Sequence, residues 1–295
     1  MRRPTTCEGA VATVPERAEQ FEAPLGQWIE KPVREINGAL YQRFVVRTHL
    51  IRPGERLDKT LHPYLAERLE RHDILVLGEK IVAIAEGRAV LLSAVHARPL
   101  ARFLSRRVRP LGYGLGLRRP ETMEMAMREV GSLRILLAAM AGAMDRVVGR
   151  SGDFYRVAGR RVAAIDGPGP TTIPPYNQYI VLAPEHPEAV IHSLARRYGC
   201  HVAVVDVNDV GSEVLAASEG ADRSLIRELL RDNPMGQGAQ GTPVAVLRPM
   251  AKRHPKSPWP TWVAPAASGW VLPLGGSGDT GLTLITDATR GGTER

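Results

Sequence analysis

The stretch that most constrains the fold runs from residue 160 to 211, where two short apolar segments each end on an aspartate. Residues 162–165 precede Asp166, and residues 202–205 precede Asp206. Short runs of valine, isoleucine and alanine that stop at turn residues are typical of buried strands. Carboxylates at the carboxyl ends of such strands often form ligand or metal sites in α/β proteins, but an aspartate also begins turns and caps helices. The pattern predicts two buried strands, and both roles for the aspartates stay open.

The charge of the chain favours an anionic partner. Its 295 residues are 44% hydrophobic and 24% charged, as in ordinary soluble proteins, and the net charge is +8. Much of the excess lies between residues 97 and 119, where seven arginines and no acidic residue occur. We interpret this stretch as a solvated helix face followed by a loop, with a phosphate or nucleic-acid patch as the alternative. Aromatic residues do not interleave with the arginines at stacking spacing, so a nucleic-acid partner is disfavoured.

Two further features predict a cytoplasmic protein. Cys7 and Cys200 are the only cysteines, and they form neither a disulfide framework nor a metal-ligand spacing. No apolar run approaches the 18 residues of a membrane span, and the first residues lack the pattern of a signal peptide.

Hydrophobic periodicity predicts an α/β, or mixed α+β, fold with mixed sheets and interleaved helices. The predicted strands are residues 43–50, a segment from 74 that continues or bends through Glu79 and Lys80, a hairpin of 152–157 with 161–165, and 178–183, 201–206 and 242–248. The predicted helices are 57–71, 121–146, 186–198 and 222–232. We expect an extension over 1–40 that is mobile or lies on the surface, one domain over 41–250, and a Gly/Pro-rich tail over 251–295.

The predicted helix over 121–146 presents an apolar face of five residues, although Gly131 weakens its middle. These are Met125, Val130, Leu133, Leu137 and Met140. Before this helix, the glycine-rich residues 112–116 follow no strand and lack a Lys-Ser/Thr ending. A flexible connector and a phosphate-binding loop both remain open for them.

Several short stretches, taken in order, resemble one known family. They are Arg-Pro-Gly-Glu at 52–55, Asp-Ile-Leu-Val-Leu at 73–77 with Glu-Lys at 79–80 and Ala-Glu-Gly-Arg at 85–88, Ile-Asp-Gly at 165–167, Val-Asp-Val-Asn-Asp-Val-Gly at 205–211, and Met-Gly-Gln at 235–237 before Gly-Thr-Pro-Val-Ala-Val-Leu-Arg at 241–248. From about residue 44 to 249 the chain resembles the coenzyme F-420:L-glutamate ligase (F-420-0:gamma-glutamyl ligase) family.

The resemblance implies the gamma-glutamyl-ligase-like fold and a ligase that joins an amino acid to a carboxylate acceptor. It implies GTP and a divalent metal, Mg²⁺ or Mn²⁺, an acyl-phosphate route, and a homodimer with the site near the subunit interface. The metal ligands that it implies are Asp166, Asp206 and Asp209, with Asn208 and Gln237 as further oxygen ligands. The nucleotide-binding candidates are Lys80, Glu79, Arg47 and Thr48.

The chain departs from the family pattern in three places. Glu79 stands where the family has a serine, and Ile84 stands where it has a second lysine. The family turn Asp-Thr-x-Gly-Arg reads Asn-Asp-Val-Gly-Ser at 208–212, so that Ser212 replaces the arginine. Two hypotheses therefore stay open. The chain is a metal- and nucleotide-dependent ligase, or it is a non-catalytic nucleotide- or metal-binding or regulatory homologue.

Overall fold

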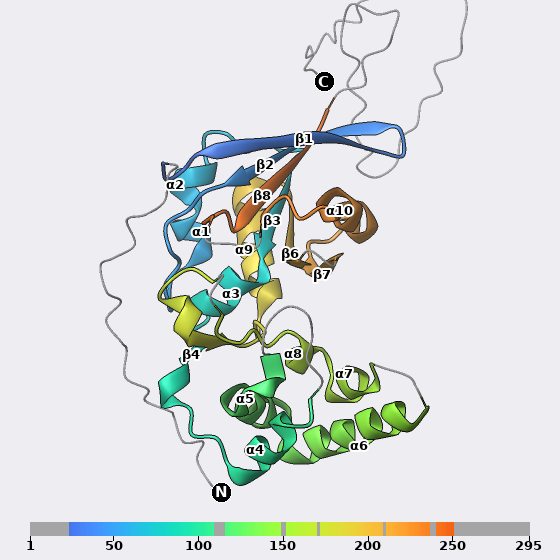
Figure 1. Cartoon of the computed structure of the whole chain (residues 1–295). Coiled ribbons are helices and arrows are strands. Elements are labelled where there is room, and N and C mark those ends of the chain that lie inside the picture. The colour runs from blue at the N-terminus through green and yellow to red at the C-terminus, as the bar shows by residue number, and fades with distance from the viewer. Residues whose placement is uncertain are drawn as a thin grey trace, which may run out of the picture. The chain divides into compact units, whose positions relative to one another are not determined.

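A six-stranded mixed sheet carries the predicted site residues (Figure 1). The computed structural model describes residues 24–108, 116–148, 152–169, 172–208, 211–236 and 240–250. In spatial order the strands are β1 (Trp28–Ile36), β2 (Ala39–Val46), β8 (Val244–Pro249), β3 (Ile74–Gly78), β6 (His201–Asn208) and β7 (Gly211–Ala217). Only β3 and β6 pair in parallel, and the other neighbours are antiparallel.

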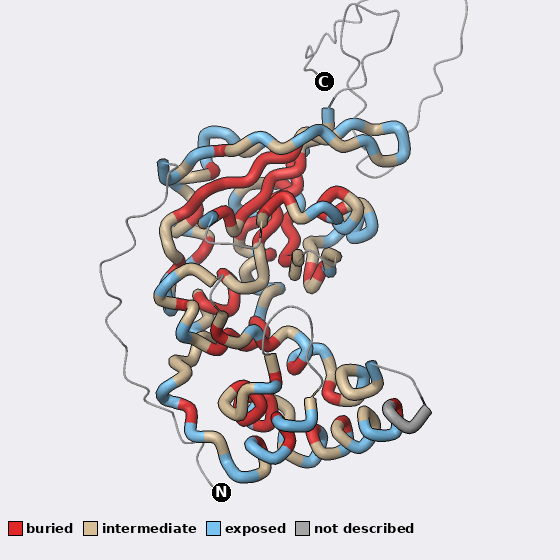
Figure 2. Tube along the Cα trace, in the orientation of Figure 1, coloured by how far each residue is buried: buried red, intermediate tan, exposed pale blue. Residues whose placement is uncertain are grey.

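Helices cover both faces of this sheet because its central strands are apolar on both sides. On one face lie α1 (Leu57–Thr60), α2 (His62–Leu65), α3 (Glu79–Ala85) and α9 (Pro187–Tyr198), which share a core with Leu75, Leu77 and Val204. On the other face α10 (Arg223–Leu230) packs on Val76 and Val205. Figure 2 shows the buried residues concentrated in these central strands. Alternate side chains of one strand point to opposite faces, so β3 and β6 contribute to both cores.

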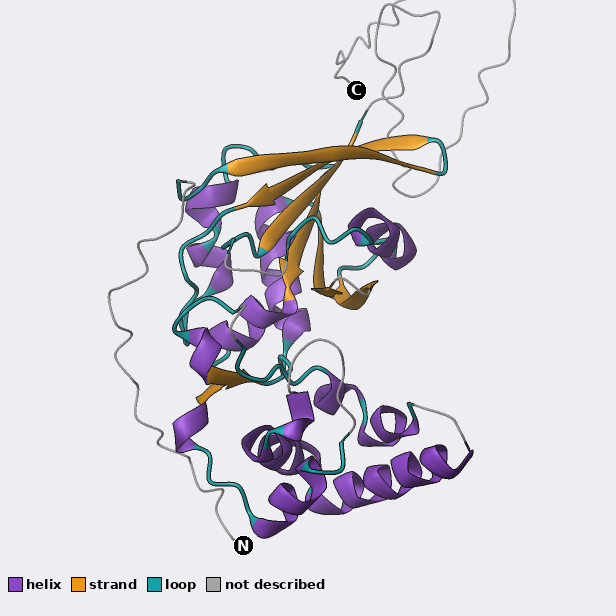
Figure 3. Cartoon of the chain, in the orientation of Figure 1, coloured by secondary structure: helices purple, strands orange, loops and turns teal. Residues whose placement is uncertain are grey.

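A second apolar cluster surrounds a small two-stranded sheet, β4 (Ala89–Leu91) with β5 (Tyr179–Val181). It is mostly helical, as Figure 3 shows. Its helices are α4 (Pro99–Ser105), α5 (Pro120–Val130), α6 (Ser132–Val148), α7 (Asp153–Ala158) and α8 (Arg160–Ala163). The mixed α+β class is thus confirmed.

The prediction for the first 40 residues was wrong where the structure describes them. Residues 28–36 form β1, which pairs along β2, whereas we expected an extension. Weak periodicity hid this strand because it is an edge strand with a register shift between Lys31 and Arg34, next to Pro32. The tail over 251–295 lies outside the described residues.

The predicted hairpin of 152–157 with 161–165 was also wrong, because these residues form α7 and α8. Phe154 and Ala158 lie about one turn apart on α7, and both pack into the helical cluster. Gly159 has φ 91° and separates the two helices. The apolar run 162–165 is therefore the end of a helix and the turn after it.

Glycine and proline divided three other predicted elements. Gly131, with φ 86°, splits the helix over 121–146 into α5 and α6. The break changes the helical phase, so Met125 is buried but Leu133, Leu137 and Met140 are exposed. Pro63 stands at the start of α2, where the helix over 57–71 becomes α1 and α2. The prediction that the strand continues or bends through Glu79 and Lys80 was wrong, because α3 begins at Glu79, directly after Gly78. The predictions of α9, α10 and β8 are confirmed.

Candidate functional site

The sheet topology brings the predicted residues of three strands to one edge. Since β8 is antiparallel to both β2 and β3, those two strands run in the same direction, and β6 runs parallel to β3. Their carboxyl ends therefore meet at one edge of the sheet. Arg47 and Thr48 follow β2, Glu79 and Lys80 follow β3, and Asn208 ends β6. Carboxyl ends of parallel strands are common ligand sites.

Glu79 is the first residue of α3 and the centre of a group of carboxylates. Gly78 pairs with Val205, so the next residues along the two strands, Glu79 and Asp206, are neighbours. The Glu79 Oε1 is buried and has no hydrogen-bond partner among the described residues. Burial first, and then the negative charge of Asp206, raise the pKa of Glu79 to about 8, and Glu213 adds a smaller effect.

Asp206 lies within β6 and does not follow its end. The strand continues to Asn208, and β7 returns beside it so that Glu213 is the register partner of Asp206. Burial raises the pKa of Asp206, and the charges of Asp166 and Glu213 raise it further. The prediction that Asp206 marks a strand end was wrong, since residues 206–208 continue the ladder with β7.

Asp166 reaches the same group from a different part of the fold. It follows α8 and joins β5 through an isolated bridge, in which its N–H donates to the Val181 carbonyl at 2.8 Å and its carbonyl accepts from the Val181 N–H at 2.9 Å. The prediction of a buried strand before Asp166 is therefore corrected. Its carboxylate forms an ion pair with Lys80, and both side chains are about half exposed.

Asn208 has a structural role in the hairpin between β6 and β7. Its Oδ1 accepts a hydrogen bond from the Gly211 N–H at 3.1 Å. This bond holds together the two strands on which Asp206 and Glu213 lie. The other predicted metal ligands, Asp209 and Gln237, lie outside the described residues.

Arg47 and Thr48 lie at the same sheet edge as Glu79, but β8 separates β2 from β3. With strands spaced about 4.8 Å apart, the two places are roughly 10 Å apart. Both side chains are buried, and the Thr48 N–H donates to the Gly241 carbonyl at 3.1 Å. The Thr48 hydroxyl donates to the His49 carbonyl at 2.9 Å. The bond to Gly241 ties the end of β2 to the loop before β8.

The residues present fit a divalent cation in the type of their donors and in their charge. Four carboxylates, of Glu79, Asp166, Asp206 and Glu213, influence one another here. Their cations are Lys80, paired with Asp166, and Arg160, paired with Glu213 at 3.0 Å. Carboxylate oxygens are the ligands of Mg²⁺ and Mn²⁺. Within the ranges that the structure describes, no three acidic, His or Cys side chains stand close enough together to hold a metal ion.

Sequence reasoning missed Glu213 and Arg160. A signal for Glu213 was available, because Asn-Asp-Val-Gly at 208–211 lies between two runs rich in apolar residues, as in a hairpin. In the structure Glu213 is the register partner of Asp206. Arg160 had no comparable signal, since its contact with β7 depends on the placement of α8.

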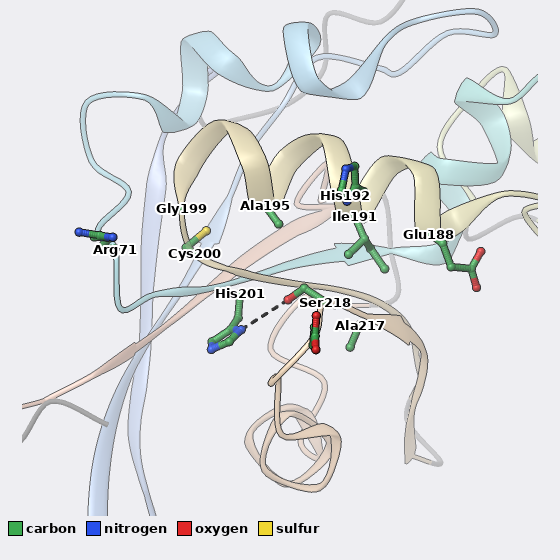
Figure 4. A pocket seen from close by; sticks show the side chains of 11 residues that line it. Arg71, Glu188, Ile191, His192, Ala195, Gly199, Cys200, His201, Ala217 and Ser218 are labelled. Atoms are coloured by element: carbon green, nitrogen blue, oxygen red, sulfur yellow. Dashed lines mark hydrogen bonds between the residues drawn. The ribbon is translucent and has the colours of Figure 1, made fainter. Parts of the chain in front are cut away.

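A pocket of about 540 Å³ lies elsewhere, at the amino end of β6 and beside α9. Figure 4 shows Arg71, His201 and the apolar residue Ile191 among the residues that line this pocket. The Ser218 hydroxyl lies 3.5 Å from the His201 Nδ1. His201 is the first residue of β6, whereas Asp206 is near its other end. The pocket contains none of the predicted site residues, so the carboxylate group at the opposite edge is the candidate site.

Comparison with known proteins found one family. The family model described as F420-0:gamma-glutamyl ligase matches residues 45–217, which is more than half of the chain and includes Lys80, Asp166 and Asp206. The chain therefore belongs to the F420-0:gamma-glutamyl ligase family. No curated protein sequence matches it. Among the described residues, none of the helices combines the length and apolar character needed to cross a membrane.

Proposed function

We propose that the chain is a metal- and nucleotide-dependent ligase that joins L-glutamate, or another amino acid, to a carboxylate acceptor through an acyl-phosphate. The observation that carries this proposal is the gathering of Glu79, Asp206 and Asp166 with Lys80 at the carboxyl edge of the sheet. The family match supports the same reaction class.

The reaction has two balanced steps. An oxygen of the acceptor carboxylate attacks the γ-phosphorus of GTP, so that a new P–O bond forms and GDP leaves with the electrons of the broken bond. The amine of the amino acid then attacks the acyl carbon, forming the C–N bond and releasing phosphate. The amine nitrogen loses a proton to a base as the amide forms.

Each residue has a proposed role in this chemistry. Asp166 and Asp206 would hold Mg²⁺ or Mn²⁺, with Asn208, Asp209 and Gln237 as the further oxygen ligands proposed from the sequence. The ion, when bound, neutralises charge on the phosphates.

The chain's own groups position the nucleotide in this proposal. Lys80 forms an ion pair with Asp166, a proposed metal ligand, and its ammonium group is proposed to contact a phosphate of the nucleotide. Arg47 and Thr48 follow β2 at the same edge of the sheet. Glu79 precedes Lys80 in the chain and lies beside Asp206, and it is proposed to border the nucleotide.

Mn²⁺ calorimetry tests the proposal directly. Asp166→Asn and Asp206→Asn should each weaken Mn²⁺ binding while thermal melting shows an intact fold, because each removes a charged oxygen ligand. Binding by the parent chain should also weaken on acidification, as the carboxylates take up protons. Glu219→Gln removes one charge from an exposed residue outside the group and serves as the matched control. Unchanged Mn²⁺ affinity in both aspartate variants would return these residues to a structural role.

The second candidate, a non-catalytic nucleotide- or metal-binding homologue, is favoured by one observation. The position where the family has a serine holds Glu79, whose carboxyl group is partly buried with an unpaired oxygen. An acid at this position gives the phosphates no positive charge, and once ionised it repels them. If GTP with Mn²⁺ raises the melting temperature but no GDP forms with L-glutamate and a panel of carboxylates, this second candidate is the better one.

We also propose that the chain forms a homodimer, and one exposed face of α6 supports this. Leu133, Leu137, Met140 and Met144 expose 71%, 50%, 66% and 62% of their surface. Their spacings of four, three and four residues match the a and d positions of a coiled coil. An uncharged, self-complementary seam of this kind suits the same helix of a second copy, and a contiguous exposed apolar stripe is unusual on a monomer.

A further inference from the structure

The amino end of α5 lies beside the turn that follows Asp166. The helix has eleven residues and begins at Pro120, and the cap residue Arg119 makes no side-chain hydrogen bond to its first turn. The first N–H groups of a helix have no partner within the helix, and they form the positive end of its dipole. A helix end of this kind favours a negatively charged group.

Thr122, the third residue of α5, provides an independent indication. Its side chain is fully buried at 0% exposure, and its Oγ1 has no hydrogen-bond partner among the described residues. The buried Nε of Arg119 likewise has no partner there. Buried polar atoms are nearly always hydrogen-bonded, so two unpaired donors at one helix end call for an explanation. An acceptor that binds both would provide one.

The Thr122 hydroxyl faces the turn at Gly167. A Cβ on Gly167 would lie 3.5 Å from the Thr122 Oγ1 and 3.8 Å from the Gly116 nitrogen. The missing side chain at Gly167 thus leaves space against the hydroxyl. Gly167 and Arg119 are only partly buried, so the hydroxyl lies just beneath the surface. Asp166, with its partner Lys80, is the residue before Gly167.

We propose that Arg119, Thr122 and the amino end of α5 form a binding subsite for a phosphoryl group. A guanidinium, a hydroxyl and backbone N–H groups are donors suited to the oxygens of a tetrahedral anion. The subsite deepens the proposed function and depends on it for the identity of its ligand. The phosphoryl group belongs either to the nucleotide or to a phosphate ester of the acceptor, and both sources present the same chemistry.

Inorganic phosphate is the first probe, measured by calorimetry on the full chain in buffer that contains EDTA. Thr122→Val keeps the shape of the side chain and removes the hydroxyl, whereas Thr122→Ser retains it. Arg119→Gln removes the guanidinium, and Arg118→Gln, at the exposed neighbouring residue, is its matched control. Gly167→Ala adds one methyl group in ordinary contact distance of Thr122 and fills the space.

The expected result is a loss of phosphate affinity of about tenfold or more in Thr122→Val and Arg119→Gln, since hydrogen bonds to charged groups are strong. Gly167→Ala should also weaken binding, while Thr122→Ser and Arg118→Gln retain it. Thermal melting of each variant verifies the fold. If Thr122 only fills space, the valine and serine variants should bind phosphate with equal affinity. That result, or no phosphate binding by the parent chain, overturns the subsite.

Competition against bound phosphate distinguishes the two sources. Displacement by GTP assigns the subsite to the nucleotide, and displacement by dimethyl phosphate assigns it to an esterified acceptor. If neither competes, the subsite is not part of a substrate site and the proposal fails. Asp206→Asn separates this test from that of the proposed function, because it should weaken Mn²⁺ binding and leave metal-free phosphate binding unchanged.

Discussion

Replacement of Glu79 by glutamine should change how the stability of the metal-free chain depends on pH. The Glu79 carboxyl is neutral in the folded chain near neutral pH because burial and the charge of Asp206 raise its pKa from 4.5 to about 8. In the unfolded chain the same group is ionised above its ordinary pKa. Stability that Glu79 contributes is therefore fully present below about pH 4.5 and is lost as the pH rises toward 8.

The size of the effect follows from the shift. Each pKa unit corresponds to about 1.4 kcal/mol, so a rise from 4.5 to about 8 sets an upper limit of about 5 kcal/mol. Glu79 remains partly accessible to solvent, which reduces this limit. We expect a loss of roughly 2–3 kcal/mol between pH 5 and pH 9 in the parent chain. Glu79→Gln has no titrating group here and should lack this part of the pH dependence.

Urea unfolding at pH 5, 7 and 9 in EDTA measures the effect. The difference in unfolding free energy between Glu79→Gln and the parent should grow with pH in favour of the variant, whatever its constant offset. Glu219→Gln controls for the loss of one surface charge. Parallel pH profiles for Glu79→Gln and the parent would show that the carboxylates do not interact as the structure places them, and would refute the reasoning.

Two further predictions concern the assembly and the sheet. The parent chain should be a dimer at micromolar concentration by light scattering, and Leu137→Lys with Met140→Lys should give a folded monomer, whereas Val33→Lys on β1 should not; a monomeric parent would contradict the homodimer. Asp73→Asn should lower the free energy of unfolding by about 3 kcal/mol, because Asp73 is fully buried and accepts two hydrogen bonds from Arg248 at 2.8 Å. Glu70→Gln, which removes an exposed contact to the same arginine, should cost less than about 1 kcal/mol in the same urea titration.

Local sequence patterns predicted the elements in which the apolar residues follow one helix or strand period without interruption. The runs that became β6 and β8 were predicted in this way, and so was the helix over 222–232, which forms α10 with Asp222 as its cap. The Asp222 Oδ1 accepts hydrogen bonds from the N–H groups of Ser224 and Leu225. The failures occurred where backbone conformation outweighed composition. The positive φ of Gly131 reset the phase of a long apolar segment, and α8 used the same residue types as a strand.

The candidate site was predictable only in part, because its members come from distant segments. Asp206 and Lys80 follow apolar runs, and the sequence indicated both. Asp206 and Lys80 are close in space because β3 and β6 are parallel neighbours, and no local sequence pattern indicates that pairing. Asp166 joins the group through a bridge to β5 and an ion pair with Lys80. The strand predicted before it is replaced by α8 and a turn.

The departures from the family pattern have a physical counterpart in this arrangement. The arginine that the resemblance places at the end of the β6–β7 hairpin is replaced by Ser212, whose hydroxyl donates to the Arg227 carbonyl at 2.8 Å. A guanidinium nevertheless reaches this hairpin, since Arg160 of α8 pairs with Glu213 on the neighbouring position of β7. A positive charge beside β7 is therefore supplied from another segment of the chain. With Lys80 already paired to Asp166, a divalent ion beside Glu79 and Asp206 would favour the charged forms of both carboxyl groups, whose pKa values are raised without it.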